Sequence, residues 1–281
     1  MDLSTNIWRR RGAAKRFGLN FSEETVTETV LLDIADQFPG NVTIIPFTRH
    51  WEARIGADWA WAFVGPNGRA CQGMLVQAKR LDDTDQEYQE LLYKGGSKKA
   101  KTSSTQMDRL IDSAARVGLP PVYAFYNHLS DPTRVPTGHC RSLGMMRQRL
   151  PESWGVAIAS AFAVRAAGSD KTYNTHRQHS RPLHCLLCSG GTGRHGPLGS
   201  AGAAASALSA LFGGAGDDMG PSPDADLQFD PTREWPELFQ YAEELYRRRT
   251  TSDETTLFDL HDEFRGVAGV VIMRDAKDEN H

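Results

Sequence analysis

The chain has 281 residues, a mass of 31.1 kDa, a net charge of −3 and 40% hydrophobic residues, which suffices for one large domain or two small ones with a sizeable core. Its longest strongly apolar run, 266–273, is far shorter than the roughly 20 residues that span a bilayer, and the N-terminal region lacks the apolar stretch of a signal peptide. We therefore expect a cytoplasmic protein that is neither membrane-spanning nor secreted. Four cysteines in so long a chain do not form a disulfide framework.

The charges are unevenly distributed along the chain. Residues 134–194 contain nine Lys and Arg against two acidic residues, whereas residues 217–281 contain seventeen acidic residues and seven basic ones. A basic middle followed by an acidic C-terminal part is typical of a protein that binds a polyanion with one face. The alternative is that the two segments face each other across an interface within the protein.

The N-terminal part begins with a basic segment and continues with a helix. Residues 1–20 are rich in Lys and Arg, show little apolar periodicity, and are interpreted as a basic lead-in. An amphipathic helix follows, because Ser22 can cap it, acidic residues stand in its first turn, and apolar residues recur at helical spacing until Pro39-Gly40.

The next segments predict an α/β core. A short strand over 42–47 is followed by two strands, 55–64 and 73–81, on either side of a Gly-Pro-Asn-Gly turn, which indicates a hairpin. Ser103 or Ser104 can cap a helix that ends at Gly118. The bulky apolar run 122–126 then predicts a strand that is buried on both faces. The order of these elements is that of a sheet in which a helix crosses between strands.

The C-terminal half is expected to add further elements to this core. Residues 154–165 predict a short helix, 182–188 a short strand, 235–249 a helix and 266–273 a final strand. The Gly-, Ala-, Ser- and Pro-rich stretch between them predicts a flexible linker, in which only 203–212 has a helical pattern. The predicted organisation is a lead-in (1–20), a core with a basic extension (21–188), a linker (189–228) and a C-terminal helix-strand unit that packs on the core (229–281).

Polar residues of the hairpin form a candidate active site. Side chains alternate between the faces of a strand, so Gln77 and Lys79 point the same way, and Asp58 is expected opposite residues 77–78. Asp58 and the Gln77 carbonyl can bind a hard divalent cation, while Lys79 can orient or help to deprotonate an attacking water. This combination predicts hydrolysis of phosphodiester bonds.

A further carboxylate is needed, because Gln77 is neutral and Asp58 alone supplies little charge for Mg²⁺. If Thr27 is the centre of the apolar face of the first amphipathic helix, Glu24 lies about 60° and Glu28 about 100° from that centre. Glu24 is therefore better aimed than Glu28. Glu52 is a third candidate, although it lies beyond the end of the expected strand.

Asp58 and the segment Val76-Gln77-Ala78-Lys79-Arg80, placed after a Glu-bearing helix, resemble the PD-(D/E)XK nuclease superfamily. The similarity is to the Gln-X-Lys variant of Mrr-type restriction endonucleases and covers less than half of the chain. The resemblance implies a restriction-endonuclease-like fold: a helix, a three-stranded meander, a crossover helix and a further strand. It implies that Asp58, Gln77 and a helix acid, Glu24 or Glu28, bind Mg²⁺ or Mn²⁺, that Lys79 is the catalytic lysine, and that Gln106 is a further polar residue of the site.

The expected activity is that of a Mg²⁺-dependent endonuclease whose partner is DNA. By the resemblance alone, its role would be restriction or another antiviral defence against foreign DNA. A homodimer fits this reading, because cutting both strands needs two sites, and defence nucleases are often held inactive by a regulatory partner. Basic residues expected to contact DNA are Arg80, Lys98, Lys99, Lys101, Arg141, Arg147 and Arg149.

Three alternatives remain open from the sequence. The hairpin can be an ordinary one with a solvated Lys79-Arg80 pair, or the fold can be an inactive nuclease that only binds nucleic acid. The third is an interaction protein stabilised by zinc. Its ligands would come from His139, Cys140, His179, His184, Cys185 and Cys188. Plain buried thiols are favoured over structural zinc, because a continuous strand would point Cys185 and Cys188 to opposite faces.

Overall fold

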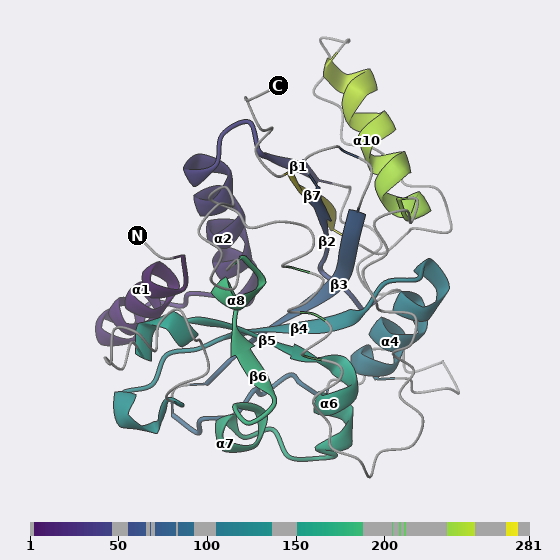
Figure 1. The fold of residues 1–281 in the computed structure, drawn as a ribbon. Helices are drawn as coiled ribbons and strands as arrows, with labels where there is room; N and C mark the ends of the chain where they lie inside the picture. The colour runs from purple at the N-terminus through teal and green to yellow at the C-terminus, as the bar shows by residue number, and fades with distance from the viewer. Residues whose placement is uncertain are drawn as a thin grey trace, which may run out of the picture.

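The computed structural model contains one mixed sheet with helices on both of its faces (Figure 1). It describes residues 3–46, 56–65, 68, 71–82, 84–92, 105–136, 151–187, 204, 208, 211, 235–250 and 268–274. In these residues the sheet has seven strands in the order β1-β7-β2-β3-β4-β5-β6. Helix α2 covers one face, and α4, α6 and α10 cover the other. No helix among the described residues has the length and apolar character needed to cross a membrane.

The elements have the following bounds. The strands are β1 Val42–Pro46, β2 Trp59–Val64, β3 Cys71–Arg80, β4 Pro121–Tyr126, β5 Val156–Ser160, β6 Ser180–Pro182 and β7 Gly269–Arg274. The α-helices are α1 Leu3–Phe17, α2 Glu23–Gln37, α4 Gln106–Val117, α6 Ala161–Ala166, α7 Tyr173–His176, α8 His184–Leu187 and α10 Glu237–Thr250. Two 3₁₀ turns are η2 Pro132–Arg134 and η3 Pro151–Trp154.

The predicted hairpin and crossover are confirmed. β2 and β3 pair antiparallel, with Trp59 opposite Val76. Their turn closes through a hydrogen bond from the Gly68 N–H to the Gly65 carbonyl oxygen (2.9 Å), and Gly68 has φ +69°, which favours glycine. Helix α4 then connects β3 to β4, and β4 pairs parallel with β3. The chain therefore has the α/β core that its pattern predicts.

The predicted three-stranded meander is wrong at its first pairing. β1 does not pair with β2, because β7 lies between them, antiparallel to β1 and parallel to β2. Residues 270–273 of β7 are all buried. The last described strand is thus an interior strand of the core sheet, whereas the sequence predicted only that it packs on the core.

The predicted basic lead-in contains a packed helix. α1 buries Leu3, Ser4, Ile7, Trp8, Arg11 and Gly12, which recur at helical spacing. Half of these buried residues are not apolar, which is why a hydrophobic pattern alone does not reveal the helix. The guanidinium of Arg11 donates hydrogen bonds to the backbone carbonyls of Leu81 and Tyr126, at the ends of β3 and β4.

Two further predictions fail in the second half of the chain. The predicted helix over 154–165 is a turn, a strand and a short helix (η3, β5 and α6), and the predicted strand over 182–188 is mostly helix α8. The run Val156–Ser160 is buried at every position, so it shows no alternation that would distinguish a strand from a helix. Within the predicted linker, the described residues Ala204, Leu208 and Leu211 are helical and belong to the buried apolar cluster that includes α2; the rest of 189–228 lies outside the described residues.

The packing of α1 can be tested at Gly155, between η3 and β5. A Cβ atom at this position would come within 2.0 Å of the Ser4 carbonyl oxygen and 2.8 Å of the Trp8 nitrogen. We expect Gly155→Ala to lower the free energy of unfolding by about 1–3 kcal/mol, because α1 must shift to relieve the overlap. Urea denaturation followed by circular dichroism measures this, and an unchanged midpoint would contradict the seating of α1.

Candidate active site

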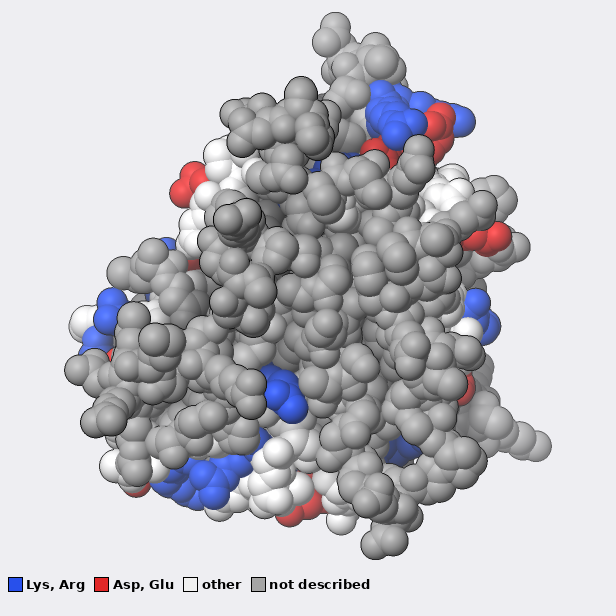
Figure 2. All heavy atoms as spheres, in the orientation of Figure 1, with Lys and Arg blue, Asp and Glu red and all other residues white. Residues whose placement is uncertain are grey.

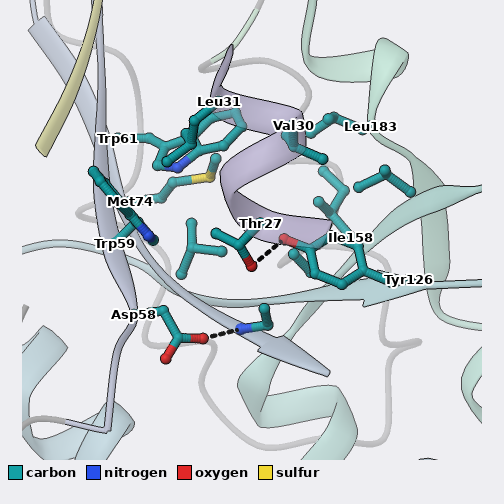
Figure 3. Close-up of a pocket in the computed structure, with 14 residues that line it drawn as sticks. Thr27, Val30, Leu31, Asp58, Trp59, Trp61, Met74, Tyr126, Ile158 and Leu183 are labelled. Carbon is teal, nitrogen blue, oxygen red and sulfur yellow. Dashed lines mark hydrogen bonds between the residues drawn. The ribbon is translucent and has the colours of Figure 1, made fainter. Parts of the chain in front are cut away.

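The polar residues of the hairpin meet at the ends of two inner strands of the sheet, where β3 ends and β2 begins. The Asp58 N–H donates to the Val76 carbonyl oxygen (2.8 Å), which continues the ladder one residue beyond β2. Its carboxylate oxygen Oδ2 accepts hydrogen bonds from the Gln77 Nε2 and from the Ala78 N–H, both at 2.7 Å; Figure 3 shows the second of these. The predicted placement of Asp58 opposite residues 77–78 is therefore confirmed.

Lys79 is buried beside a carboxylate of α2. Its Nζ lies 3.2 Å from Oε1 of Glu23, and the Lys79 side chain is 3% exposed. The other carboxylate oxygen of Glu23 accepts the N–H of Arg80 at 3.1 Å. Glu23 is the first residue of α2, which Ser22 caps by accepting the Thr25 N–H. The start of α2 thus fixes the end of β3 through both a side chain and the backbone.

The carboxylate of α2 that the structure places against Lys79 is Glu23, in place of the expected Glu24 or Glu28. Both of those side chains are exposed, whereas Glu23 is partly buried and contacts Lys79. At the first position of the helix, Glu23 lies at the sheet edge where β3 ends, so its side chain can reach around the end of the strand. Glu52, the third candidate, lies outside the described residues.

The Glu23 carboxyl is held in an environment that disfavours its charge. Its pKa is raised to about 7, chiefly because burial removes water from the carboxylate, and further because Asp58 and Glu90 are negative neighbours. Lys79 opposes this shift and does not cancel it. A second positive charge at the site, such as a bound cation, would relieve the repulsion between the carboxylates.

Gln106 joins the site from the start of α4. Its Nε2 donates to Oε1 of Gln77 at 2.8 Å, so a chain of amide hydrogen bonds runs from Gln106 through Gln77 to Asp58. The cap of α4 is Thr105, with Asp108 completing a capping box, in place of the predicted Ser103 or Ser104. The N-termini of α2 and α4 therefore both lie at the site, where their dipoles favour negative charge.

Gly56 is a further residue on which the site depends. It has φ +74°, and a Cβ atom there would lie 2.4 Å from the Gln106 carbonyl oxygen and 2.8 Å from the Leu110 nitrogen. Only glycine allows the segment before Asp58 to approach α4 so closely. The signal for this approach in the sequence is a glycine two residues before the candidate aspartate.

The oxygen donors of the site suit a hard divalent cation. The carboxylates of Asp58 and Glu23 and the amide of Gln77 are the ligand types that Mg²⁺ prefers. In the described part of the chain, no three His, Cys, Asp or Glu side chains are placed to hold a metal ion together. Mg²⁺ commonly uses one or two carboxylates and completes its shell with water and substrate phosphate, so this donor set fits it.

An apolar cavity lies on the opposite face of the sheet from Lys79, under α2. Figure 3 shows Trp59, Trp61 and Met74 on one side of it, with the Thr27 hydroxyl bonded to the Tyr126 hydroxyl at 2.8 Å. Its volume of about 20 Å³ is room for one water molecule. The cavity is therefore too small to admit a substrate group.

The candidate zinc ligands are only partly described. His179 contacts the buried His176 (Nε2 to Nδ1, 3.1 Å), and Cys185 is partly exposed. Burial lowers the pKa of His179 to about 4, so both imidazoles are neutral near pH 7. His139, Cys140 and Cys188 lie outside the described residues.

Most residues predicted to contact DNA also lie outside the described residues, namely Lys98, Lys99, Lys101, Arg141, Arg147 and Arg149. Arg80 is described and lies directly beside the site. Figure 2 shows the described Lys and Arg side chains in separate groups, and over α10 they adjoin acidic side chains. There Arg247 and Arg248 pair with Glu243 and Glu244 one helical turn away.

The raised pKa of Glu23 predicts a pH-dependent stability. Because the folded protein holds this proton up to about pH 7 and the unfolded chain releases it near 4.5, the contribution of Glu23 to the free energy of unfolding falls as pH rises through that window. We expect Glu23→Gln to remove this pH-dependent contribution to the free energy of unfolding, which is on the order of 2 kcal/mol. Urea titrations across the window measure it; Glu24→Gln is the control, and an unchanged pH slope in Glu23→Gln would contradict the assignment.

Comparison with known proteins gives a family without an assigned activity. The model of a family of unknown function, DUF6615, matches residues 1–279. No curated protein matches the chain.

Proposed function

The chain belongs to the family of unknown function DUF6615, and we propose that this member hydrolyses phosphodiester bonds of DNA with the help of a divalent metal ion. The observation that carries the proposal is the convergence of Asp58, Gln77, Lys79 and Glu23 at the start of two helices. Two carboxylates, an amide and a buried ammonium at one sheet edge match the needs of phosphodiester hydrolysis.

In this proposal Asp58, Glu23 and the Gln77 carbonyl hold the metal ion, which is Mg²⁺ or Mn²⁺. The ion supplies a Lewis acid that activates water and stabilises charge on the phosphate. The Gln77 carbonyl faces Asp58 if the side-chain amides of Gln77 and Gln106 both turn over. The Gln77 Nε2 then donates to the Gln106 carbonyl oxygen, so a hydrogen bond between the two glutamines is kept. Gln106 is thus a positioning residue for Gln77.

Lys79 and Glu23 form the ion pair of the proposed site. The Lys79 ammonium stabilises the negative charge that develops on the phosphate, and it holds the attacking water by a hydrogen bond. Glu23, which contacts the same ammonium at 3.2 Å, fixes its position at the end of β3. The two helix N-termini add partial positive charge where the phosphate would lie.

The arrangement of elements supports the same proposal. The hairpin β2-β3, the crossover α4 and the parallel strand β4 follow the order expected of a restriction-endonuclease-like core. The departure is β7, which separates β1 from β2 without touching β3. The site residues lie on α2, α4 and the β2-β3 hairpin, so the inserted strand leaves their arrangement intact. Defence against foreign DNA is the setting proposed on the sequence resemblance alone.

The test is cleavage of supercoiled plasmid, linear DNA and single-stranded RNA, with Mg²⁺ or Mn²⁺ and with EDTA. We expect metal-dependent cleavage of DNA by the wild type and a loss of at least about 10²-fold in Lys79→Met. Methionine keeps the length of the buried side chain and removes its charge. Arg247→Met, which removes a charge from the exposed side of α10, is the control and should cleave normally.

Each contrary result has a definite meaning. Equal cleavage by the wild type and Lys79→Met would show that the nuclease activity does not use this site. Binding of DNA without cleavage under any metal condition would favour an inactive nuclease fold. Bound zinc that is lost together with folding in a Cys185→Ser, Cys188→Ser double variant would favour the zinc-stabilised interaction protein.

A further inference from the structure

Two large apolar side chains are exposed where α1 ends and the chain turns towards α2. Phe17 is 74% exposed and Leu19 is 67% exposed. Phe21, two residues further along, packs instead against the buried apolar cluster that includes α2. Single exposed apolar side chains are common on protein surfaces, whereas exposed apolar side chains that occur together mark interaction sites. Phe17 and Leu19 are therefore a candidate contact for another molecule.

The turn that carries these two side chains has a fixed backbone. Gly18 has φ +65°, the Leu19 N–H donates to the Ala14 carbonyl oxygen (2.9 Å), and the Gly18 N–H donates to the Lys15 carbonyl oxygen (3.2 Å). This pair of hydrogen bonds is the Schellman motif. In that motif the residue after the glycine often packs back on the helix, whereas Leu19 stays mostly exposed. The turn is ordered before any partner binds, which lowers the entropic cost of a contact made there.

Arg80 ties this turn to the candidate active site. Its guanidinium donates to the Asn20 side-chain oxygen and to the Phe21 carbonyl oxygen, at 3.4 and 3.3 Å. Its backbone N–H donates to the Glu23 carboxylate at 3.1 Å, and the other oxygen of that carboxylate contacts Lys79. One residue at the end of β3 therefore holds both the turn and the carboxylate beside Lys79.

The turn lies within a few nucleotides of the groups proposed to act on the phosphate. Leu19 precedes Glu23 by four residues, which span at most about 14 Å. Successive bases of a DNA strand are about 3.4 Å apart along the helix axis, so this distance covers about four base steps. Arg16, whose side chain is exposed, directly precedes Phe17. An aromatic side chain beside a cation is a combination that binds nucleic-acid strands.

We propose that Phe17 and Leu19 insert between bases of the bound DNA, close to the phosphate that is hydrolysed. The inference rests on the proposed function for the identity of the strand. Apolar side chains inserted at a base step partly unstack the bases and kink the duplex. The cost of disrupting the stack is lowest where bases are already mismatched or damaged. The substrate class that follows is duplex DNA with locally weakened stacking.

The test is DNA binding in EDTA, where no cleavage occurs. Fluorescence anisotropy compares two end-labelled duplexes of about 20 base pairs, one fully paired and one with a central mismatch. We expect the wild type to bind the mismatched duplex about tenfold more tightly, because less stacking has to be broken. The double variant Phe17→Ser, Leu19→Ser should bind that duplex about tenfold more weakly than the wild type and lose the preference.

The matched control is Leu32→Ser, which removes a leucine of the same exposure (68%) from α2. It should bind both duplexes as the wild type does. An equal loss in Leu32→Ser would overturn the inference, because it would indicate a general effect of surface apolarity. An unchanged affinity and preference in the double variant would also overturn it. A loss by the same factor for both duplexes would show surface contact without insertion.

A membrane surface is the other class of partner for exposed apolar side chains on a basic helix. If the double variant loses binding to vesicles that contain phosphatidylserine while its DNA binding is unchanged, that partner replaces DNA. These results are separable from the nuclease test, because Lys79→Met reports cleavage and the double variant reports binding. If the wild type cleaves DNA and the double variant binds and cleaves equally well, insertion alone fails. If the wild type neither binds nor cleaves DNA, the proposed function fails together with this inference.

Discussion

The register between β2 and β3 is the constraint on which the candidate site depends. With Trp59 opposite Val76, the Asp58 carboxylate accepts two N–H groups of the neighbouring strand at once, from the Gln77 side chain and the Ala78 backbone. A slip of one residue would exchange the two faces of β3. The buried packing of Val76 and Ala78 against the α2 side resists such a slip, so apolar contacts on one face hold the polar groups in place on the other.

Helix starts then close the site around this strand pair. The first residue of α2 contacts Lys79, and the first residue of α4 contacts Gln77. Each helix is capped just before that residue, by Ser22 and Thr105. The caps fix the backbone at these positions, and the helix dipoles favour negative charge there. The same enclosure that orders them removes water from Glu23, which is the main cause of its raised pKa.

The parts of the site that depend on local geometry could be predicted from the sequence. Turn chemistry at Gly65–Gly68 and the alternation of a strand place Asp58, Gln77 and Lys79 together. Glu23 also lies close to the apolar face, because helical rotation puts it about 40° from Thr27, but its contact with Lys79 depends on how α2 docks on the end of β3. α1 was hidden by the Ser, Arg and Gly of its buried stripe. The insertion of β7 has no local signal, because its partners are more than 200 residues away in sequence.

The place of β7 also has a consequence for biosynthesis. Strands β1 and β2 emerge early from the ribosome. Among the described strands, β1 has no partner and β2 is paired only with β3 until residues 269–274 have been translated and placed between them. Until then both strands expose unpaired backbone and apolar side chains, which is the condition that favours association with other nascent chains. The contact order of the sheet is accordingly high, and the fold closes only when segments from opposite ends of the chain meet. A protein built in this way completes its sheet only after residues 269–274 have been synthesised.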